Sequence, residues 1–143
     1  MNKTNNALKL ITYPSLCKYN SLVHFTSTRD GGVSDGSFSS LNLGLYSGDE
    51  SRNIEENYFR LLSEINIERN QIHLPYQTHG NSVCLIDTEF LKMDAHSQAK
   101  KLHGVDALIT NVPRQCIAIS TADCVPILIF DPVNHAIAAI HAG

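Results

Sequence analysis

Three side chains that can bind metals or act as nucleophiles stand at the ends of apolar segments. His79 lies in QTHG, Cys124 in TADC and His141 in IHAG. Because side chains at strand ends converge at one edge of a sheet, these three can meet in the fold. Two imidazoles and one thiolate form a ligand set that suits zinc and leaves one coordination position for water or substrate. The residue types therefore raise the hypothesis of a catalytic metal site.

Two interpretations without a metal use the same residues. Cys124 can act as a thiolate nucleophile that either histidine activates, with Asp123 orienting that histidine. Alternatively, Asp123 caps a turn and Cys124 fills the core, because most buried cysteines are chemically inert. The spacing of the three residues matches no short-range metal motif, so the sequence pattern leaves all three interpretations open.

Three other polar residues could contact a ligand. Arg29 precedes the glycine-rich DGGVS, where its guanidinium and the backbone N–H groups could hold phosphate or carboxylate; the alternative is a hairpin turn with a solvated arginine. Asn42 stands between two leucines and suits either turn capping or ligand binding. Asp106 begins an apolar segment, where a carboxylate needs a partner, and it could support a histidine ligand.

In the first half of the chain, patterning predicts one helix and short strands around a long loop. LKLITY is compatible with an edge strand, and the alternation over residues 22–28 predicts a second strand. Residues 30–44 are rich in glycine and serine and predict a functional loop. Residues 51–67 carry the apolar stripe of an amphipathic helix. Its members are Ile54, Tyr58, Leu61, Leu62 and Ile65.

The sequence pattern in the second half of the chain predicts a β-sheet. Residues 72–87 predict a strand interrupted at Pro75 and Gly80, and residues 88–103 predict a mobile connection with one helical turn. From Val105 onward, four apolar runs indicate strands covered on both faces, the last two joined as a hairpin over 125–141 by the turn DPVNH. We therefore expect one α/β (mixed α+β) domain over residues 1–143.

Composition argues against two classes of partner. The formal net charge is −3 and the eleven Lys and Arg residues are scattered, which disfavours nucleic acid. No segment approaches the roughly 20 apolar residues of a membrane span, and the N-terminus lacks the apolar core of a signal peptide. The four cysteines show no CxxC pair or disulfide-framework spacing, so we expect a reducing, cytoplasmic location.

Five segments together resemble the multicopper polyphenol oxidase family, also called the laccase-domain or YfiH-like family. They are HFTSTRDGGVSDGSFSSLNLG, QTHGNSV, GVDALIT, ISTADCVPILIFD and AAIHAG, which occur in the family's order over about residues 22–143. The resemblance implies a YfiH-like α/β sandwich and a cytosolic enzyme of purine nucleoside metabolism. The implied activities are phosphorolysis of adenosine, inosine and methylthioadenosine, together with adenosine deamination, with purine nucleoside and phosphate as the partners.

The resemblance also implies roles for the residues singled out above. His79, Cys124 and His141 correspond to the family's zinc ligands, and Asp123 joins them as a catalytic residue. Copper is the other metal to consider. The family's older label, a copper-dependent polyphenol oxidase, suits the sequence less well, because such oxidases need many more histidines in paired spacing.

Further positions correspond to the substrate side of the same pocket. They are Arg29, Asn42 and Asp106. Family members continue past HAG into a segment with tryptophan and arginine, so the resemblance predicts that this chain is a C-terminally truncated version of a longer protein. A metal-free cysteine hydrolase and a catalytically silent fragment remain as alternatives.

Overall fold

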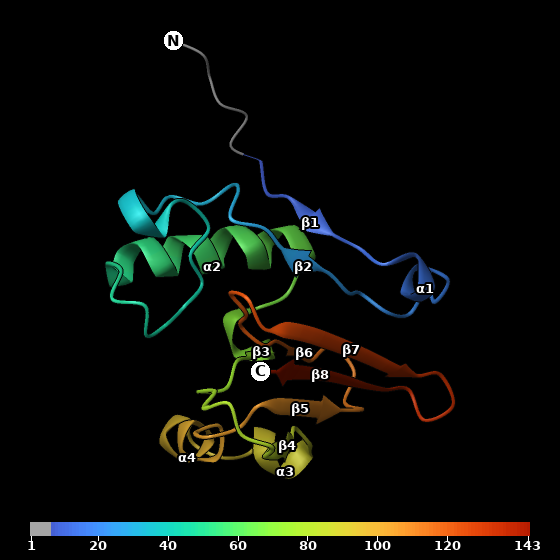
Figure 1. Cartoon of the computed structure of the whole chain (residues 1–143). Coiled ribbons are helices and arrows are strands. Elements are labelled where there is room, and N and C mark those ends of the chain that lie inside the picture. Colours follow the sequence, from blue (N-terminus) through green and yellow to red (C-terminus); the bar gives the residue numbers. More distant parts are fainter. Residues whose placement is uncertain (1–6) are drawn as a thin grey trace. The chain divides into compact units, whose positions relative to one another are not determined.

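The computed structural model describes residues 7–143. These residues form two compact units whose boundary in the chain falls between Arg69 and Asn70. The structure has the mixed α/β architecture expected from the sequence (Figure 1). Within residues 7–143, every helix is too short or too polar to span a bilayer. Two units do not by themselves decide the number of domains, so the single domain over 1–143 stays a prediction.

The first unit begins with a small antiparallel pair. Strand β1 (Leu10–Ile11) pairs with β2 (Thr26–Ser27), and helix α1 (Pro14–Cys17) lies in the connection between them. The sequence predicted a longer strand over residues 22–28, which is wrong in extent. The backbone N–H of Tyr13 donates to Nε2 of His24 at 2.9 Å. A side chain therefore takes the place of backbone pairing between the two strands at this point.

Helix α2 (Ser51–Ile65) confirms the amphipathic helix. Four residues of the predicted stripe are buried: Ile54, Tyr58, Leu61 and Leu62. The helix ends two residues earlier than predicted, because Asn66 adopts a left-handed conformation with φ of 54°. Asparagine tolerates this conformation at a helix end better than most residues do.

The glycine-rich loop of this unit folds around Asn57, which α2 carries and which is fully buried. The Asn57 Oδ1 accepts the N–H of Val33 at 2.8 Å, and its Nδ2 donates to Ser34 Oγ and to the carbonyl of Asn42, both at 2.9 Å. A Cβ on Gly32 would stand 1.9 Å from the carbonyl oxygen of Ser40, so the loop closes only with glycine there. One amide therefore holds several turns of the loop together.

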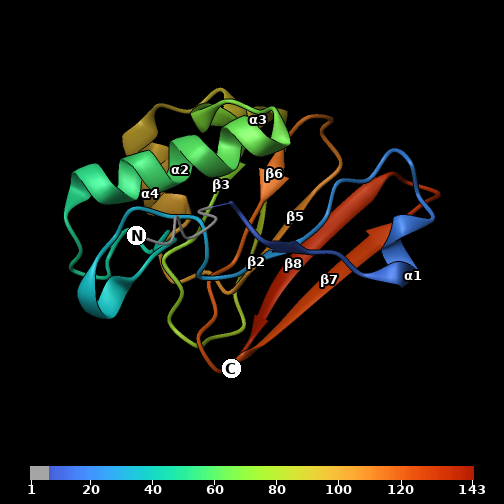
Figure 2. The ribbon, with the colours of Figure 1, turned by 90° about the horizontal axis from the view of Figure 1, so that it is seen from above.

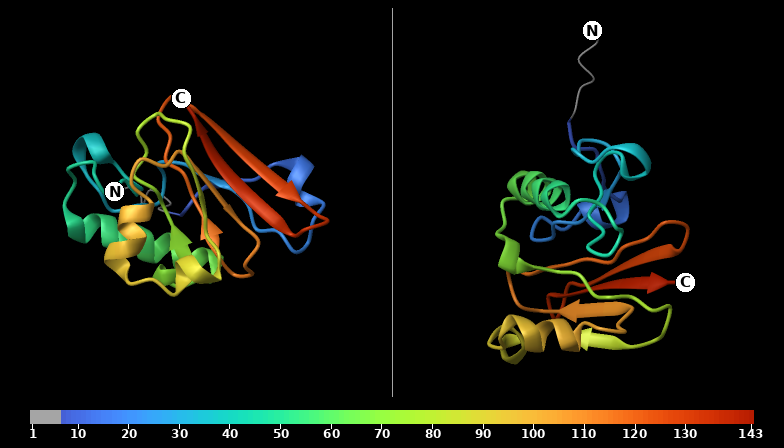
Figure 3. Two further views of the ribbon diagram at one scale, coloured as in Figure 1. Left: turned by 90° about the horizontal axis from the view of Figure 1, so that it is seen from below. Right: turned by 90° about the vertical axis from the view of Figure 1, so that its left-hand side faces the viewer.

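The second unit contains a four-stranded sheet in the order β4-β5-β8-β7. Strands β4 (Val83–Leu85) and β5 (Ala107–Thr110) are parallel, and β8 (Ala136–Ala142) is antiparallel to both β5 and β7 (Val125–Asp131). The predicted hairpin is thus confirmed, and Figure 3 shows it as the long orange-to-red pair. Strand β3 (Ile72–His73) pairs with β6 (Cys116–Ile117) in a separate parallel pair.

The segment 88–103 contains more helix than predicted. Helices α3 (Thr88–Leu91) and α4 (Ala95–Lys101) replace the single expected turn, and both are labelled in Figure 2. The Asp87 carboxylate accepts the N–H of Phe90 at 2.8 Å, and Asp94 accepts that of Ser97 at 3.0 Å. Side-chain caps of this kind satisfy N–H groups that the first turn leaves free, which stabilises even short helices.

The two faces of the sheet differ in burial. One face contributes Cys84 and Leu108 to a core that also contains Ile86, Phe90 and Val105. The prediction that all strands are covered on both faces is wrong for β7. Alternate residues on one face of β7, the edge strand, remain exposed; they are Val125, Ile127 and Ile129.

Candidate metal centre

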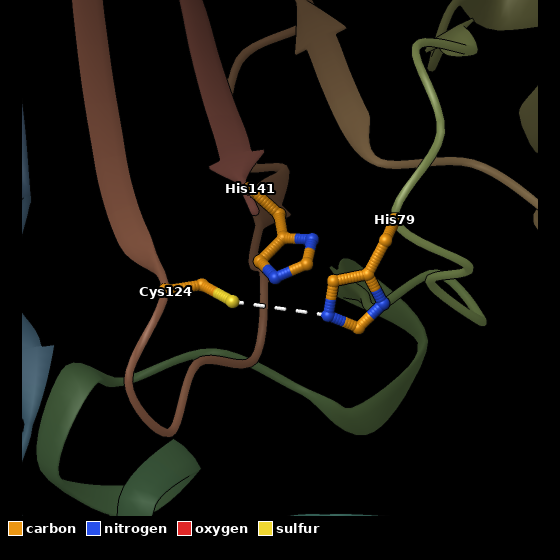
Figure 4. A group of neighbouring side chains, drawn as sticks. All are labelled: His79, Cys124 and His141. Atoms are coloured by element: carbon orange, nitrogen blue, oxygen red, sulfur yellow. Dashed lines mark hydrogen bonds between the residues drawn. The ribbon is translucent and has the colours of Figure 1, made fainter.

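The second unit brings His79, Cys124 and His141 to one point (Figure 4). His79 lies between β3 and β4, Cys124 directly precedes β7, and His141 belongs to β8. One potential ligand atom from each residue lies within 4.8 Å of the others, and Cys124 Sγ is 3.8 Å from His79 Nε2. His79 is exposed, Cys124 is half-buried and His141 is buried, so the group is open to solvent on one side.

The hairpin register explains the approach of Cys124 to His141. Val125 pairs with Ala142 and Pro126 with His141, so the residue before β7 lies beside the end of β8. His141 projects to the same face of the sheet as Ala139 and Leu108, which are buried. A polar ring on this face needs a hydrogen-bond partner.

Asp106 provides that partner and also organises the segment around His79. Its Oδ1 lies 2.7 Å from Nδ1 of His141, and its carboxylate accepts the backbone N–H groups of Thr78, His79 and Gly80 at 3.3, 3.0 and 2.8 Å. His79 has a φ of 59°, a left-handed conformation that is uncommon outside glycine. Three consecutive N–H groups around one carboxylate hold the chain in this conformation.

The protonation of Asp106 follows from these contacts. Burial of the carboxyl raises its pKa, but the hydrogen bonds from His141, Gly80, Thr78 and His79 outweigh it and lower the pKa from 3.8 to about 2. An ionised carboxylate requires a proton on Nδ1 of His141, which leaves Nε2 of the neutral ring free for a metal ion. The sequence had allowed Asp106 a role in supporting a histidine, and this is where the structure places its carboxylate.

The chemistry and spacing of the three donors fit a metal ion. Ligands bound tetrahedrally at about 2.0–2.3 Å from zinc lie roughly 3.3–3.8 Å from one another, so the donors need to move together only slightly. Gly143 leaves room for this arrangement, since a Cβ there would stand 2.7 Å from Cδ2 of His79. Two imidazoles and a thiolate are ligands that suit zinc and also copper.

Asp123 stands beside the thiol. It is exposed, and its Oδ1 lies 3.9 Å from Sγ of Cys124. A solvated carboxylate at this position is available to exchange protons with a molecule bound at the open side of the group. Its catalytic role stays a prediction.

Arg29 and Asn42 belong to the first unit, where both stabilise the loop that contains them. Arg29 Nε donates to the carbonyl of Ser39 at 2.7 Å, and its Nη2 donates to the same oxygen. Asn42 Nδ2 donates to Ser47 Oγ at 2.7 Å, and its Oδ1 accepts the N–H of Gly44 at 3.0 Å. Asn42 thus caps a turn, and the substrate-binding roles of both residues stay predictions.

Sequence patterning missed Gln77, which lies two residues before His79. Its side chain forms two hydrogen bonds with the backbone of Ser120: Oε1 accepts the N–H at 2.7 Å and Nε2 donates to the carbonyl at 2.8 Å. An exposed-looking glutamine next to Thr78 gives no local signal of a partner 43 residues away. Its proximity to His79 in the sequence was the one available indication.

The chain is similar in sequence to a known family and to curated proteins. Residues 23–143 match the family model described as multi-copper polyphenol oxidoreductase laccase. A purine nucleoside phosphorylase from Bacteroides thetaiotaomicron is 42% identical over 135 residues, which cover 94% of this chain and 50% of that protein. A protein named adenosine deaminase RL5, from an unknown prokaryotic organism, is 34% identical over 83% of this chain and 45% of its own length.

Solved structures share the fold. YfiH from Bacillus licheniformis superposes with a TM-score of 0.75 at 27% identity, over 83% of this chain and 45% of that one. YlmD from Geobacillus stearothermophilus gives a TM-score of 0.73 at 32% identity, over 82% of this chain and 43% of that one. The chain spans about half the length of the relatives it matches. By the extent of the match, the chain belongs to the multi-copper polyphenol oxidoreductase laccase family, with a YfiH-like fold.

Proposed function

We propose that His79, Cys124 and His141 hold a zinc ion, and that the protein containing this centre is a purine nucleoside phosphorylase with adenosine deaminase activity. The observation that carries the proposal is the meeting of three donors from separate segments within 4.8 Å. The names of the two relatives support the activities. Because the chain spans about half their length, the metal centre is proposed for this chain and the activities for the whole protein.

The two reactions require the same assistance. In deamination, a water oxygen bonds to C6 of adenine and the amine leaves as ammonia after gaining a proton. In phosphorolysis, a phosphate oxygen bonds to C1′ of the ribose while the bond from C1′ to the base nitrogen breaks and the base gains a proton. Bound zinc supplies a positive centre that orients the oxygen nucleophile and makes it reactive at neutral pH.

The residues of the chain prepare this centre. Asp106 holds Nδ1 of His141 and so directs Nε2 of that ring to the shared point. Asp123 is the proposed proton carrier, since it is an exposed carboxylate 3.9 Å from the thiol. In the first unit, Arg29 is proposed as a phosphate-binding residue, because a guanidinium forms paired hydrogen bonds with phosphate oxygens.

Elemental analysis of the purified protein tests the centre. We expect about one zinc per chain in the wild type and a large loss in Cys124→Ser, because the thiolate is the strongest of the three donors for zinc. Purified protein of the full length of these relatives should also release hypoxanthine from inosine when phosphate is present. Zinc that is absent from the wild type, or undiminished in Cys124→Ser, would contradict the proposal.

The 3.8 Å separation of Cys124 Sγ and His79 Nε2 favours one second candidate, a metal-free cysteine hydrolase. In that enzyme, iodoacetamide abolishes activity and strong chelators leave it intact. In the zinc enzyme, chelators and iodoacetamide both reduce activity.

A further inference from the structure

The pairing of β3 with β6 ends before it reaches the metal centre. The last backbone hydrogen bond of this pair runs from the N–H of Ala118 to the carbonyl of His73, at 2.9 Å. Two residues after His73, Pro75 has no N–H to offer. The two segments nevertheless continue toward the ligands His79 and Cys124.

The side chain of Gln77 takes over where the backbone pairing ends. A primary amide carries the same donor and acceptor as a peptide group. The Gln77 amide uses both on one residue, accepting the N–H of Ser120 at 2.7 Å and donating to its carbonyl at 2.8 Å. It therefore acts as one more pairing step between the two segments.

These two bonds matter because the segment before Cys124 has no regular secondary structure to hold it. Residues 118–124 form neither helix nor strand. Two hydrogen bonds join Ser120, in this segment, to Gln77. The β7–β8 pairing fixes the chain that follows Cys124, from Val125 onward. Gln77 fixes the chain that precedes it, at Ser120.

Asp106 and Gln77 each position a different pair of the segments that carry the ligands. Asp106 joins the His79 segment to His141, and Gln77 joins the His79 segment to the segment of Cys124. Together they connect all three donors through residues 77–80.

We propose that Gln77 is a positioning residue that holds the Cys124 thiolate beside His79 through Ser120, and so sets the thiolate's contribution to the metal centre. The role of Gln77 rests on the proposed metal centre. Because this role concerns the sulfur ligand, a measurement of thiolate binding to the metal distinguishes it from an effect on the stability of the fold.

Titration of the full chain with Co²⁺ measures this role. Cobalt bound to a thiolate has a charge-transfer band in the near ultraviolet, and its visible bands report the number of ligands. In Gln77→Met, which keeps the length of the side chain and removes both hydrogen bonds, we expect cobalt affinity to fall by about 10-fold or more. We also expect a weaker thiolate band per bound cobalt, with the circular dichroism of the wild type retained.

Gln71→Met is the matched control. The Gln71 Nε2 donates to the carbonyl of Arg114 at 3.1 Å, so a similar side-chain bond joins the same two segments at the other end of the β3–β6 pair. This variant should keep the cobalt affinity and the thiolate band of the wild type. A second variant, Gln77→Glu, keeps the acceptor for Ser120 and loses the donor, and it should lie between Gln77→Met and the wild type.

The outcomes separate the two proposals. A wild-type affinity and thiolate band in both Gln77→Met and Gln77→Glu overturn the positioning role and leave the metal centre in place. Equal losses in Gln71→Met and Gln77→Met also overturn it, because they would show a general effect of the strand pair. A wild-type chain without a thiolate band overturns the metal centre and the role of Gln77 with it.

Discussion

Each unit of the described chain folds a loop around a buried polar side chain, Asn57 in the first and Asp106 in the second. Asn57 is a neutral amide that accepts from the N–H of Val33 and donates to the carbonyl of Asn42. Asp106 is a carboxylate that gathers donors only, three backbone N–H groups and the ring of His141. The amide suits a loop with mixed donors and acceptors, whereas the carboxylate concentrates negative charge next to two histidines.

The difference indicates what each loop can do. A neutral amide does not titrate, so its hydrogen bonds to the loop do not depend on pH, and it adds no net charge to its surroundings. An ionised carboxylate fixes the tautomer of His141 and favours a cation near the free ring nitrogen. The second loop is therefore the one whose charge favours a bound cation, and three experiments can break or sharpen this comparison.

The largest effect is expected from Asp106→Ala. It leaves three N–H groups and the buried Nδ1 of His141 without their acceptor, so we expect the free energy of unfolding to fall by about 3–5 kcal/mol, as when one partner of a buried pair is removed. Urea unfolding followed by circular dichroism measures it. The control is Asp94→Ala, which removes an exposed helix cap and should lower the free energy of unfolding far less than Asp106→Ala does. Equal losses in the two variants would refute the central role of Asp106.

A smaller loss is expected when the amide of the first unit becomes a carboxylate. In Asn57→Asp, an oxygen replaces the nitrogen that donates to Ser34 Oγ and the Asn42 carbonyl, so we expect a loss of about 2–3 kcal/mol at neutral pH. Acid should partly restore stability relative to the wild type, because a protonated carboxyl can again donate one hydrogen bond. Urea unfolding at pH 7 and pH 4 measures both, and Asn57→Ala, which should show no such recovery, is the control.

The smallest effect is expected from acid on the wild type. The pKa of Asp106 is lowered from 3.8 to about 2, so its carboxylate contributes stability that is fully present above the ordinary pKa near 4. That contribution is lost as the pH falls from about 4 toward 2. Urea unfolding between pH 5 and pH 2 should show a shallower decline in Asp106→Asn than in the wild type. Parallel declines would contradict the role of this carboxylate.

Much of the fold could be predicted from local pattern. The stripe of α2 identified its buried residues, and the apolar runs around DPVNH identified the β7–β8 hairpin. Only one helical turn was predicted where helices α3 and α4 lie, because the segment is polar and has no apolar periodicity. Its two caps, Asp87 and Asp94, were the local signals that it offered. The exposed face of β7 was also missed, since an apolar run looks the same whether one face of the strand is covered or both are.

The sequence by itself determined the residue types of the candidate centre and the places of Cys124 and His141 at strand ends, whereas His79 lies in the connection between β3 and β4. Only the tertiary structure decided that His79, Cys124 and His141 share one point, and that Asp106 and Gln77 join the segments that carry them. The reason is the range of the interactions. Helix and hairpin patterns arise between residues close in the chain, whereas a hydrogen bond between residues 43 positions apart leaves no periodic trace in the sequence.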